Sequence, residues 1–395
     1  MIVRKTRPDE ARRINELFAI CFEIPYSNCP ADPENDRDTH WTAYDENGEM
    51  MSNFTIPDYT IRFDGNICKM GGIGGVATLP QYRRRGAIRA CFEAALPDMY
   101  ENGYEFSYLY PFSTRFYRQF GYECCVQKYS WEINLSLLTP PRQNGTFRLA
   151  EKNRPMTDAI RAVDGVWERH FNMMVQHKEE DYPWTQAADP AVKQEFTYVW
   201  FDAENAPKAY TTFKTANEAG GRNILCSRFC FVDREGFLGL MQLFKSLSSD
   251  HTYANFSTPA LPSLQYLMPE WSLGAAKWSV LANAGMVRVI NVRRVLEKAK
   301  YIGSGQLTLE IEDLQIPENN GRFTVVFSGG RATSVTQTRE EPDAVLTIPT
   351  FSALIAGVWD FEEAKYTVSG LDIRNGEACF RQVFFRKPMM IVDFF

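Results

Sequence analysis

Residues 71–89 read GGIGGVATLPQYRRRGAIR, and the interpretation of the fold starts from this stretch. A glycine-rich run typical of a strand leads into a proline, three arginines and Gly86. Apolar residues then recur at spacings of three and four over 87–99, which predicts a helix. The first N–H groups of a helix have no partner within it, and the helix dipole adds partial positive charge there. The sequence therefore predicts an anion-binding loop, in which Gly86 allows close approach and the arginines supply forked donors.

The loop differs from two common phosphate-binding motifs. No Gly-Lys-Ser/Thr follows it, as in a Walker A loop, and no G-x-G-x-x-G opens the helix, as in a dinucleotide-binding fold. An exposed basic turn in front of a surface helix is the alternative, because R-x-x-G is a short and common pattern. Further signals are needed to decide between the two.

A second signal lies downstream of the expected helix. Aromatic residues alternate over 104–110, which is typical of a strand. Residues 111–123 then read PFSTRFYRQFGYE, so that Tyr117 precedes an aromatic-glycine-aromatic turn.

Together these segments resemble the GNAT acetyltransferases. Residues 83–88, Arg-Arg-Arg-Gly-Ala-Ile, are similar to the family's pyrophosphate loop, Arg/Gln-x-x-Gly-x-Gly/Ala, except at Ile88. That departure, with the Arg-Arg-Arg-Gly run, resembles one branch, the enhanced intracellular survival (Eis) N-acetyltransferases. The resemblance covers the whole chain and is most specific over 71–122 and at the aromatic C-terminus. It implies direct transfer of an acetyl group from acetyl-CoA to a primary amine of the aminoglycoside, polyamine or lysine type.

The resemblance also implies the residues of the site. Tyr117 would be the general acid, and the α-carboxylate of Phe395 the base. The residues implied to hold acetyl-CoA, at its pantetheine arm, its pyrophosphate or its thioester end, are Val76, Ala77, Thr78, Arg84, Arg85, Gly86, Ala87, Ile88, Arg89, Phe112 and Ser113. Two alternatives stay open: Tyr117 as an aromatic residue of the core, and a C-terminus whose last aromatic residues only pack.

The order of the expected elements predicts three domains. Over 1–140 it is β-α-β-β-β-α-β, consistent with a catalytic GNAT domain. Over 145–285 the order is echoed, but residues 231–237 carry acids and one arginine where the basic loop would fall, so this domain is interpreted as degenerate. The strands and the short helix expected over 287–395 resemble the sterol-carrier-protein fold, which in this family ends in the active site. The predicted fold class is α/β plus α+β: two tandem GNAT-like domains followed by a sterol-carrier-protein-like domain.

Composition limits the partners. A net charge of −6 and the lack of a long basic block beyond residues 83–85 disfavour nucleic acid and suit a small cationic amine. Nine cysteines without a C-x-x-C pair or a histidine cluster predict free thiols in the cytoplasm and no metal. No apolar stretch has the length of a signal peptide or a membrane span. The resemblance implies a homo-oligomer, namely a hexamer.

Two other functions stay open at this stage. The chain could carry a lipid or another hydrophobic ligand in its C-terminal domain, or it could bind CoA without transferring anything. The first rests on fold analogy alone, and the second needs the basic loop but not Tyr117.

Overall fold

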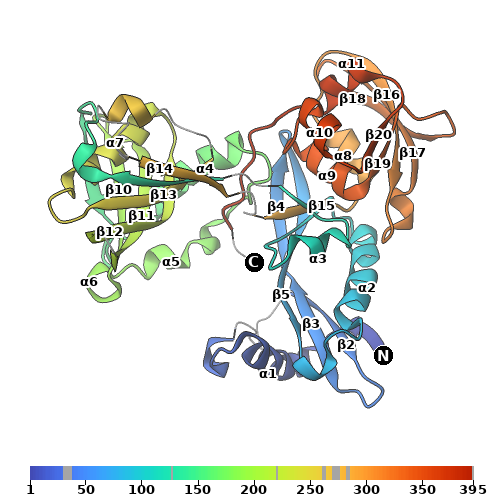
Figure 1. Cartoon of the computed structure of the whole chain (residues 1–395). Coiled ribbons are helices and arrows are strands. Elements are labelled where there is room, and N and C mark those ends of the chain that lie inside the picture. Colours follow the sequence, from blue (N-terminus) through green and yellow to red (C-terminus); the bar gives the residue numbers. More distant parts are fainter. Residues whose placement is uncertain are drawn as a thin grey trace. The chain divides into compact units, whose positions relative to one another are not determined.

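The structure, a computed structural model, describes residues 1–29, 38–125, 128–218, 221–259, 264–268, 276–281 and 285–393. Contacts within the chain divide it into two units (Figure 1). The first unit combines Met1–Val126 with Asn283–Phe395, and the second is Gln127–Ala282. Within the described residues, no helix has both the length and the hydropathy of a membrane span.

The first unit contains a mixed sheet with the strand order β1-β2-β3-β5-β6-β15-β7, and β4 pairs with β5 beside this path. Its helices α1 and α2 pack against these strands, and α2 contacts β1, β2, β3 and β5. The bounds are β1 (Ile2–Lys5), α1 (Ala11–Phe22), β2 (Thr39–Tyr44), β3 (Met50–Ile56), β4 (Asp58–Phe63), β5 (Asn66–Thr78), α2 (Ala87–Glu101), β6 (Phe106–Leu109), α3 (Thr114–Arg118), β7 (Glu123–Cys124) and β15 (Met286–Val289).

Strands β5 and β6 run parallel and then separate. Their pairing extends from Met70 opposite Phe106 to Ile73 opposite Leu109, where β6 ends, whereas β5 continues to Thr78 along β3. Gly75 lies in this continuation with a φ of 59°. A Cβ atom added to Gly75 would lie 2.6 Å from Cζ of Phe18 in α1, so both the backbone angle and the packing require glycine.

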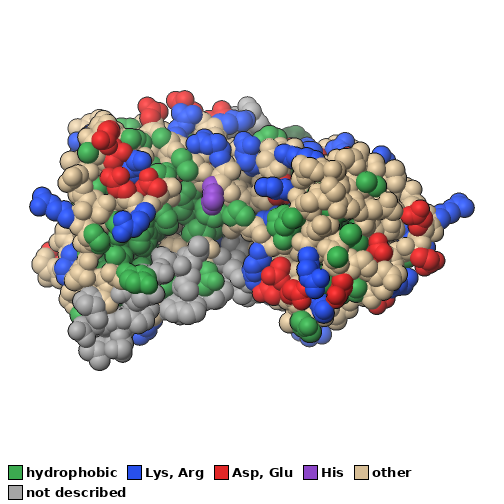
Figure 2. Space-filling view, turned by 90° about the horizontal axis from the view of Figure 1, so that it is seen from above, with side chains coloured by type: hydrophobic (Ala, Val, Ile, Leu, Met, Phe, Trp, Pro, Cys, Tyr) green, Lys and Arg blue, Asp and Glu red, His purple; other side chains and the backbone are tan. Residues whose placement is uncertain are grey.

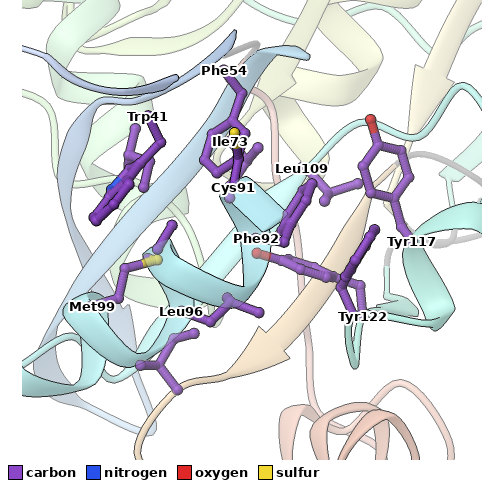
Figure 3. Packing of buried hydrophobic residues seen from close by; sticks show 14 of the residues in the cluster. Trp41, Phe54, Ile73, Cys91, Phe92, Leu96, Met99, Leu109, Tyr117 and Tyr122 are labelled. Atoms are coloured by element: carbon purple, nitrogen blue, oxygen red, sulfur yellow. The ribbon is translucent and has the colours of Figure 1, made fainter. Parts of the chain in front are cut away.

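The core of this part is aromatic and joins α2 to the segment around Tyr117 (Figure 3). The ring of Phe92 stacks on that of Phe120, with centroids 4.2 Å apart, and on that of Phe54, at 4.7 Å. Tyr117 and Tyr122 meet the same Phe92 ring edge-on, at 6.1 and 6.3 Å. Such aromatic pairs contribute about 0.5–1.5 kcal/mol each beyond their burial, so this cluster fixes α3 against α2.

The sheets divide the chain differently from the expected ranges 1–140 and 145–285. Strand β8 (Lys128–Asn134) pairs with β13 (Tyr253–Thr258) and β14 (Ala276–Leu281) in the sheet of the second unit. Conversely, β15 pairs with β6 and β7 in the first unit. Strand β8 thus lies within the range 1–140 but belongs to the sheet of the second unit, and β15 follows residue 285 but belongs to the first sheet. The local sequence pattern of a short strand does not specify the strand with which it pairs.

The second unit repeats the topology of the first. Its sheet has the order β14-β8-β13-β12-β11-β10-β9, and β12 and β13 form the parallel pair, as β5 and β6 do. The bounds are β9 (Gly145–Leu149), α4 (Thr157–His170), α5 (Pro183–Gln186), α6 (Pro190–Lys193), β10 (Glu195–Asp202), β11 (Pro207–Glu218), β12 (Gly221–Phe231), α7 (Arg234–Ser246), β13 (Tyr253–Thr258) and β14 (Ala276–Leu281). Helix α7, the counterpart of α2, begins at Arg234, within the 231–237 segment where the basic loop is missing.

The third sheet belongs to the first unit and has the order β18-β17-β16-β19-β20. Its elements are α8 (Val292–Lys298), β16 (Gly305–Glu312), β17 (Gly321–Ser328), β18 (Arg331–Thr338), β19 (Ala344–Thr347), α9 (Ile348–Ala356), α10 (Phe361–Thr367), β20 (Leu371–Ile373) and α11 (Glu377–Val383). A buried ion pair joins this region to the β4–β5 hairpin: Lys387 Nζ lies 2.6 Å from Asp64 Oδ2. Burial lowers the pKa of Lys387, whereas Asp64 opposes that effect.

Candidate functional site

The basic loop connects the free end of β5 to α2. Two of its residues have left-handed backbone angles, Arg84 with a φ of 62° and Gly86, at the N-cap of α2, with a φ of 78°. Backbone bends of this kind turn successive N–H groups to one side, where they form an anion-binding concavity. An added Cβ on Gly86 would meet no atom within 4 Å, so there is open space in front of the helix N-terminus.

A cavity of about 660 Å³ lies at this loop, within the usual size range of ligand pockets. Nine of the residues expected to hold acetyl-CoA line it: Val76, Ala77, Thr78, Arg84, Gly86, Ala87, Ile88, Arg89 and Phe112. The other lining residues are Cys21, Phe22, Tyr82, Arg83, Phe116 and Gln119. The cavity therefore combines the end of β5, the basic loop, the start of α2, the segment around α3 and the end of α1.

Three expected site residues lie outside the lining of this cavity. The Arg85 guanidinium lies over the Tyr82 ring, 5.5 Å from its centroid. The Ser113 side chain caps α3 by accepting a hydrogen bond from Phe116 N at 3.3 Å. Tyr117 is buried in the aromatic core, with 2% of its surface exposed. Their assigned roles in binding and catalysis stay predictions.

The cationic side of the cavity is formed by three arginines with different surroundings. Arg83 Nε donates to Thr78 O at 3.4 Å. Arg89 donates to the Gln119 side chain. Among the described residues, no hydrogen bond or ion pair engages the Arg84 guanidinium. Arg84 therefore keeps all of its donors available to an anion in the cavity, whereas Arg83 and Arg89 each have one nitrogen engaged.

The opposite side of the cavity is aromatic and leads toward Tyr117. The Phe112 side chain is 70% exposed, and its ring centroid lies 5.2 Å from those of both Phe116 and Tyr117. Burial raises the pKa of Tyr117 above that of a free phenol, and the nearby Tyr122 acts in the same direction. A free phenol is already protonated at neutral pH, so the raised pKa keeps Tyr117 in the state that a proton donor starts from and makes that proton harder to release.

The sequence analysis missed the residues that α1 contributes. Cys21 and Phe22 lie more than 50 residues before the basic loop and carry no motif. By contrast, Phe116 and Gln119 lie within the PFSTRFYRQFGYE segment, which could have indicated them. Burial raises the pKa of the Cys21 thiol, and Arg83 opposes this only in part, so Cys21 is a lining group rather than a thiolate nucleophile.

The expected base, Phe395, lies outside the described residues. The described chain ends at Asp393, and its charge contributes, after burial, to raising the pKa of Tyr110. Tyr110 directly follows β6, at the point where β5 and β6 have separated. Ile391 lies close to Gly285 in the same region. The end of the described chain is therefore near the open end of the β5–β6 pair.

Within the residues that the structure places, no group of three or more His, Cys, Asp and Glu side chains is arranged to hold a metal ion. All nine cysteines are free.

Family models match two segments of the chain. Residues 2–125 match the acetyltransferase (GNAT) domain, and residues 292–368 match the sterol carrier protein domain. These matches confirm the predicted fold class and the prediction of an acetyltransferase enzyme, whose family uses acetyl-CoA. No protein with a curated description matches the chain.

Several solved structures share the fold over the full length. A conserved protein of unknown function from Enterococcus faecalis V583, described as a probable N-acyltransferase, has a TM-score of 0.85 at 22% identity, covering 100% of this chain and 99% of that one. A GCN5-related N-acetyltransferase from Anabaena variabilis has a TM-score of 0.84 at 19% identity, covering 100% of both chains. Eis1 from Mycobacterium abscessus has a TM-score of 0.81 at 16% identity, also covering 100% of both. At these identities the likeness shows the fold.

The different surroundings of Arg84 and Arg85 give a prediction for binding. We expect Arg84→Ala to weaken acetyl-CoA binding at least about tenfold, because a charge-assisted hydrogen bond contributes roughly 1.5–3 kcal/mol. Arg85→Ala should have a smaller effect, since its guanidinium lies over Tyr82 outside the cavity lining. Isothermal titration calorimetry measures both values, and equal losses for the two variants would contradict the assignment.

Proposed function

We propose that the chain is an Eis-like N-acetyltransferase that transfers the acetyl group of acetyl-CoA directly to a primary amine. The observation that carries the proposal is the cavity at the basic loop, which joins the unpaired edge of β5 to the N-terminus of α2 and the aromatic segment before Tyr117. The strand edge suits an amide-bearing arm, the basic loop suits a pyrophosphate, and the proton donor suits a thioester.

The cavity residues fit acetyl-CoA in chemistry as well as in shape. The edge of β5 beyond Ile73 offers backbone donors and acceptors of the kind that bind an added strand. Arg84 and the first N–H groups of α2 offer positive charge for the pyrophosphate. Phe112 and Phe116 offer an apolar border toward Tyr117. When bound, acetyl-CoA supplies the acetyl group as a thioester.

The residues of the chain then have two proton transfers to perform. Tyr117 gives its hydroxyl proton to the sulfur as the C–S bond breaks. A carboxylate takes the proton that the amine loses as the new C–N bond forms, and the α-carboxylate of Phe395 is proposed for this step. The ammonium form of such an amine, with a pKa of about 10.4, first loses one proton to the solvent, which costs about 4–5 kcal/mol at pH 7. The neutral amine then attacks the thioester, and the proton that it loses as the C–N bond forms is the one that the carboxylate takes.

The proposed acceptor is a small cationic amine of the aminoglycoside, polyamine or lysine type. The net charge of −6 supports a cation more than a nucleic acid. On the face shown in Figure 2, positively and negatively charged side chains both occur. We infer a cytoplasmic homo-hexamer from the Eis resemblance, and analytical ultracentrifugation would test the oligomeric state.

Turnover with a panel of amines tests the function. We expect acetyl-CoA to release free thiol in the presence of at least one of spermidine, tobramycin or a lysine peptide, with the N-acetylated product visible by mass spectrometry. A hydrophobic-ligand carrier, the alternative that the sterol carrier protein match favours, would release no thiol and would bind a fluorescent fatty acid. Binding of acetyl-CoA without turnover for any amine would indicate the third alternative.

Tyr117→Phe tests the general acid. This change removes one oxygen, and we expect it to lower kcat about 10²–10⁴-fold with little effect on the Kd of acetyl-CoA. Tyr122→Phe is the matched control, because Tyr122 is buried in the same cluster and its hydroxyl bonds Ser107 Oγ at 2.7 Å. The control should lose about 1 kcal/mol of stability and keep its turnover. Wild-type kcat in Tyr117→Phe would leave Tyr117 as a packing residue only.

Altering the end of the chain tests the base. We expect deletion of Phe395, or a short tag after it, to abolish transfer while the fold and acetyl-CoA binding persist, because both changes displace the α-carboxylate and the tag does so without removing the Phe395 side chain. The same tag before Met1 is the control and should leave kcat unchanged. Full turnover of the C-terminally tagged protein would refute a catalytic role for the carboxylate.

A further inference from the structure

A fully buried arginine lies beneath the turn that follows Tyr117. Arg288 in β15 and Asp313, directly after β16, both have side chains with no exposed surface. Arg288 Nη2 donates to both carboxylate oxygens of Asp313 at 2.7 Å. Its second nitrogen, Nη1, donates to the backbone oxygen of Phe120 at 2.6 Å. The guanidinium therefore links β15, the C-terminal sheet region and the segment around α3.

This bond explains the glycine of the aromatic-glycine-aromatic turn. Gly121 has a φ of 82°, and a Cβ atom added to it would lie 1.5 Å from Arg288 Nη1. The turn itself closes back onto α3, since Phe120 N donates to Tyr117 O at 3.0 Å and Tyr122 N to the same oxygen at 3.4 Å. The residues on either side of Gly121 are thus both hydrogen-bonded to the backbone oxygen of Tyr117.

A second donor from the C-terminal region holds the preceding carbonyl. Gln315 Nε2 donates to Gln119 O at 2.9 Å, while the Gln119 side chain lines the cavity and accepts from Arg89. Gln315 is held in turn, because its backbone N–H donates to Asp313 Oδ1 at 3.0 Å. Two consecutive carbonyls at the end of α3 are therefore fixed by one network centred on Asp313.

We propose that Arg288 and Gln315 are positioning residues for the transfer reaction, which act through the end of α3 on the Tyr117 hydroxyl. The inference rests on the proposed role of Tyr117 as the acid. It assigns the C-terminal domain a task besides supplying the chain end: Asp313 orients the donors that hold the acid in place. A buried ion pair often contributes no more to the stability of a protein than apolar residues of similar volume would. What apolar residues could not supply is the hydrogen bond from Arg288 that holds the Phe120 carbonyl.

The test uses a neutral replacement of the buried pair. Arg288→Met with Asp313→Asn removes both charges together, and the Asn oxygen still accepts from the backbone N–H groups of Gln315 and Ile316. We expect the double variant to bind acetyl-CoA within about threefold of wild type and to lose at least about tenfold in kcat, since small misplacements of catalytic groups are costly. Amide hydrogen exchange should rise over residues 114–122.

A matched control neutralises another pair between the first sheet and the C-terminal region. Lys298 Nζ lies 2.8 Å from Oε1 of Glu105, the residue directly before β6. Lys298→Met with Glu105→Gln should leave both kcat and exchange over residues 114–122 unchanged. Gln315→Leu is the second test variant, because it removes one donor without changing a buried charge. It should lower kcat about threefold or more and raise exchange in the same segment.

A cycle with Tyr117→Phe separates this inference from the proposed function. If Arg288 acts through Tyr117, the pair variant should cost little further kcat in the Tyr117→Phe background. A full additional loss there, or unchanged kcat and unchanged exchange in both the pair variant and Gln315→Leu, would overturn the inference. Wild-type turnover of Tyr117→Phe alone would instead overturn the acid assignment, and the exchange measurement would still report whether the pair holds α3.

Discussion

The early end of the parallel pairing between β5 and β6 is the constraint on which the site depends. After Ile73 and Leu109 the strands separate, so residues 74–78 pair with β3 on one side only. Backbone polar groups need partners, and a ligand with its own amides can supply them as an added strand does. Gly75 lies in this separated stretch, where its φ and the ring of Phe18 leave no room for a side chain. Only eight residues separate the end of β5 from the start of α2, and the strand edge and the basic loop line the same cavity.

Another part of the cavity lining comes from the segment around α3, which is too short to be a stable helix by itself. Helix α3 has five residues, fewer than an isolated helix needs, and depends on packing and on its ends. Ser113 caps its start, the ring of Phe92 packs on that of Tyr117, and the ring of Phe120 packs on that of Phe116. The two carbonyls that follow α3, those of Gln119 and Phe120, are bound from the segment after β16 and from β15. The geometry of Tyr117 is therefore set by parts of the chain far from it in sequence.

The sequence predicted the features whose causes are local. Gly86 and the apolar spacing after it marked the start of α2, and the order of elements predicted the mixed α/β fold with an α+β domain behind it. The exchange of β8 and β15 between the sheets could not be predicted, because strand pairing is a long-range choice. Arg84 and Arg85 are the same residue type, so the sequence could not show which of them lines the cavity. In the structure Arg84 lines it and Arg85 does not, and Arg84 has a left-handed backbone conformation. Gly121 was visible as a turn, but its close neighbour Arg288 lies 167 residues away.

The second unit shows that a change in one loop is enough to remove the anion-binding features while the fold is kept. It has the same strand order and the same parallel pair, and α7 stands in the place of α2. At the start of α7, however, the Asp233 carboxylate accepts from Gly236 N at 2.9 Å and pairs with Lys208 at 3.0 Å. A carboxylate at this end of a helix satisfies the N–H groups that a phosphate would bind, and its charge repels one. The same framework therefore leaves the N–H groups at the helix start open to an anion or blocks them according to one short loop, so activity has to be argued from the loop and not from the fold.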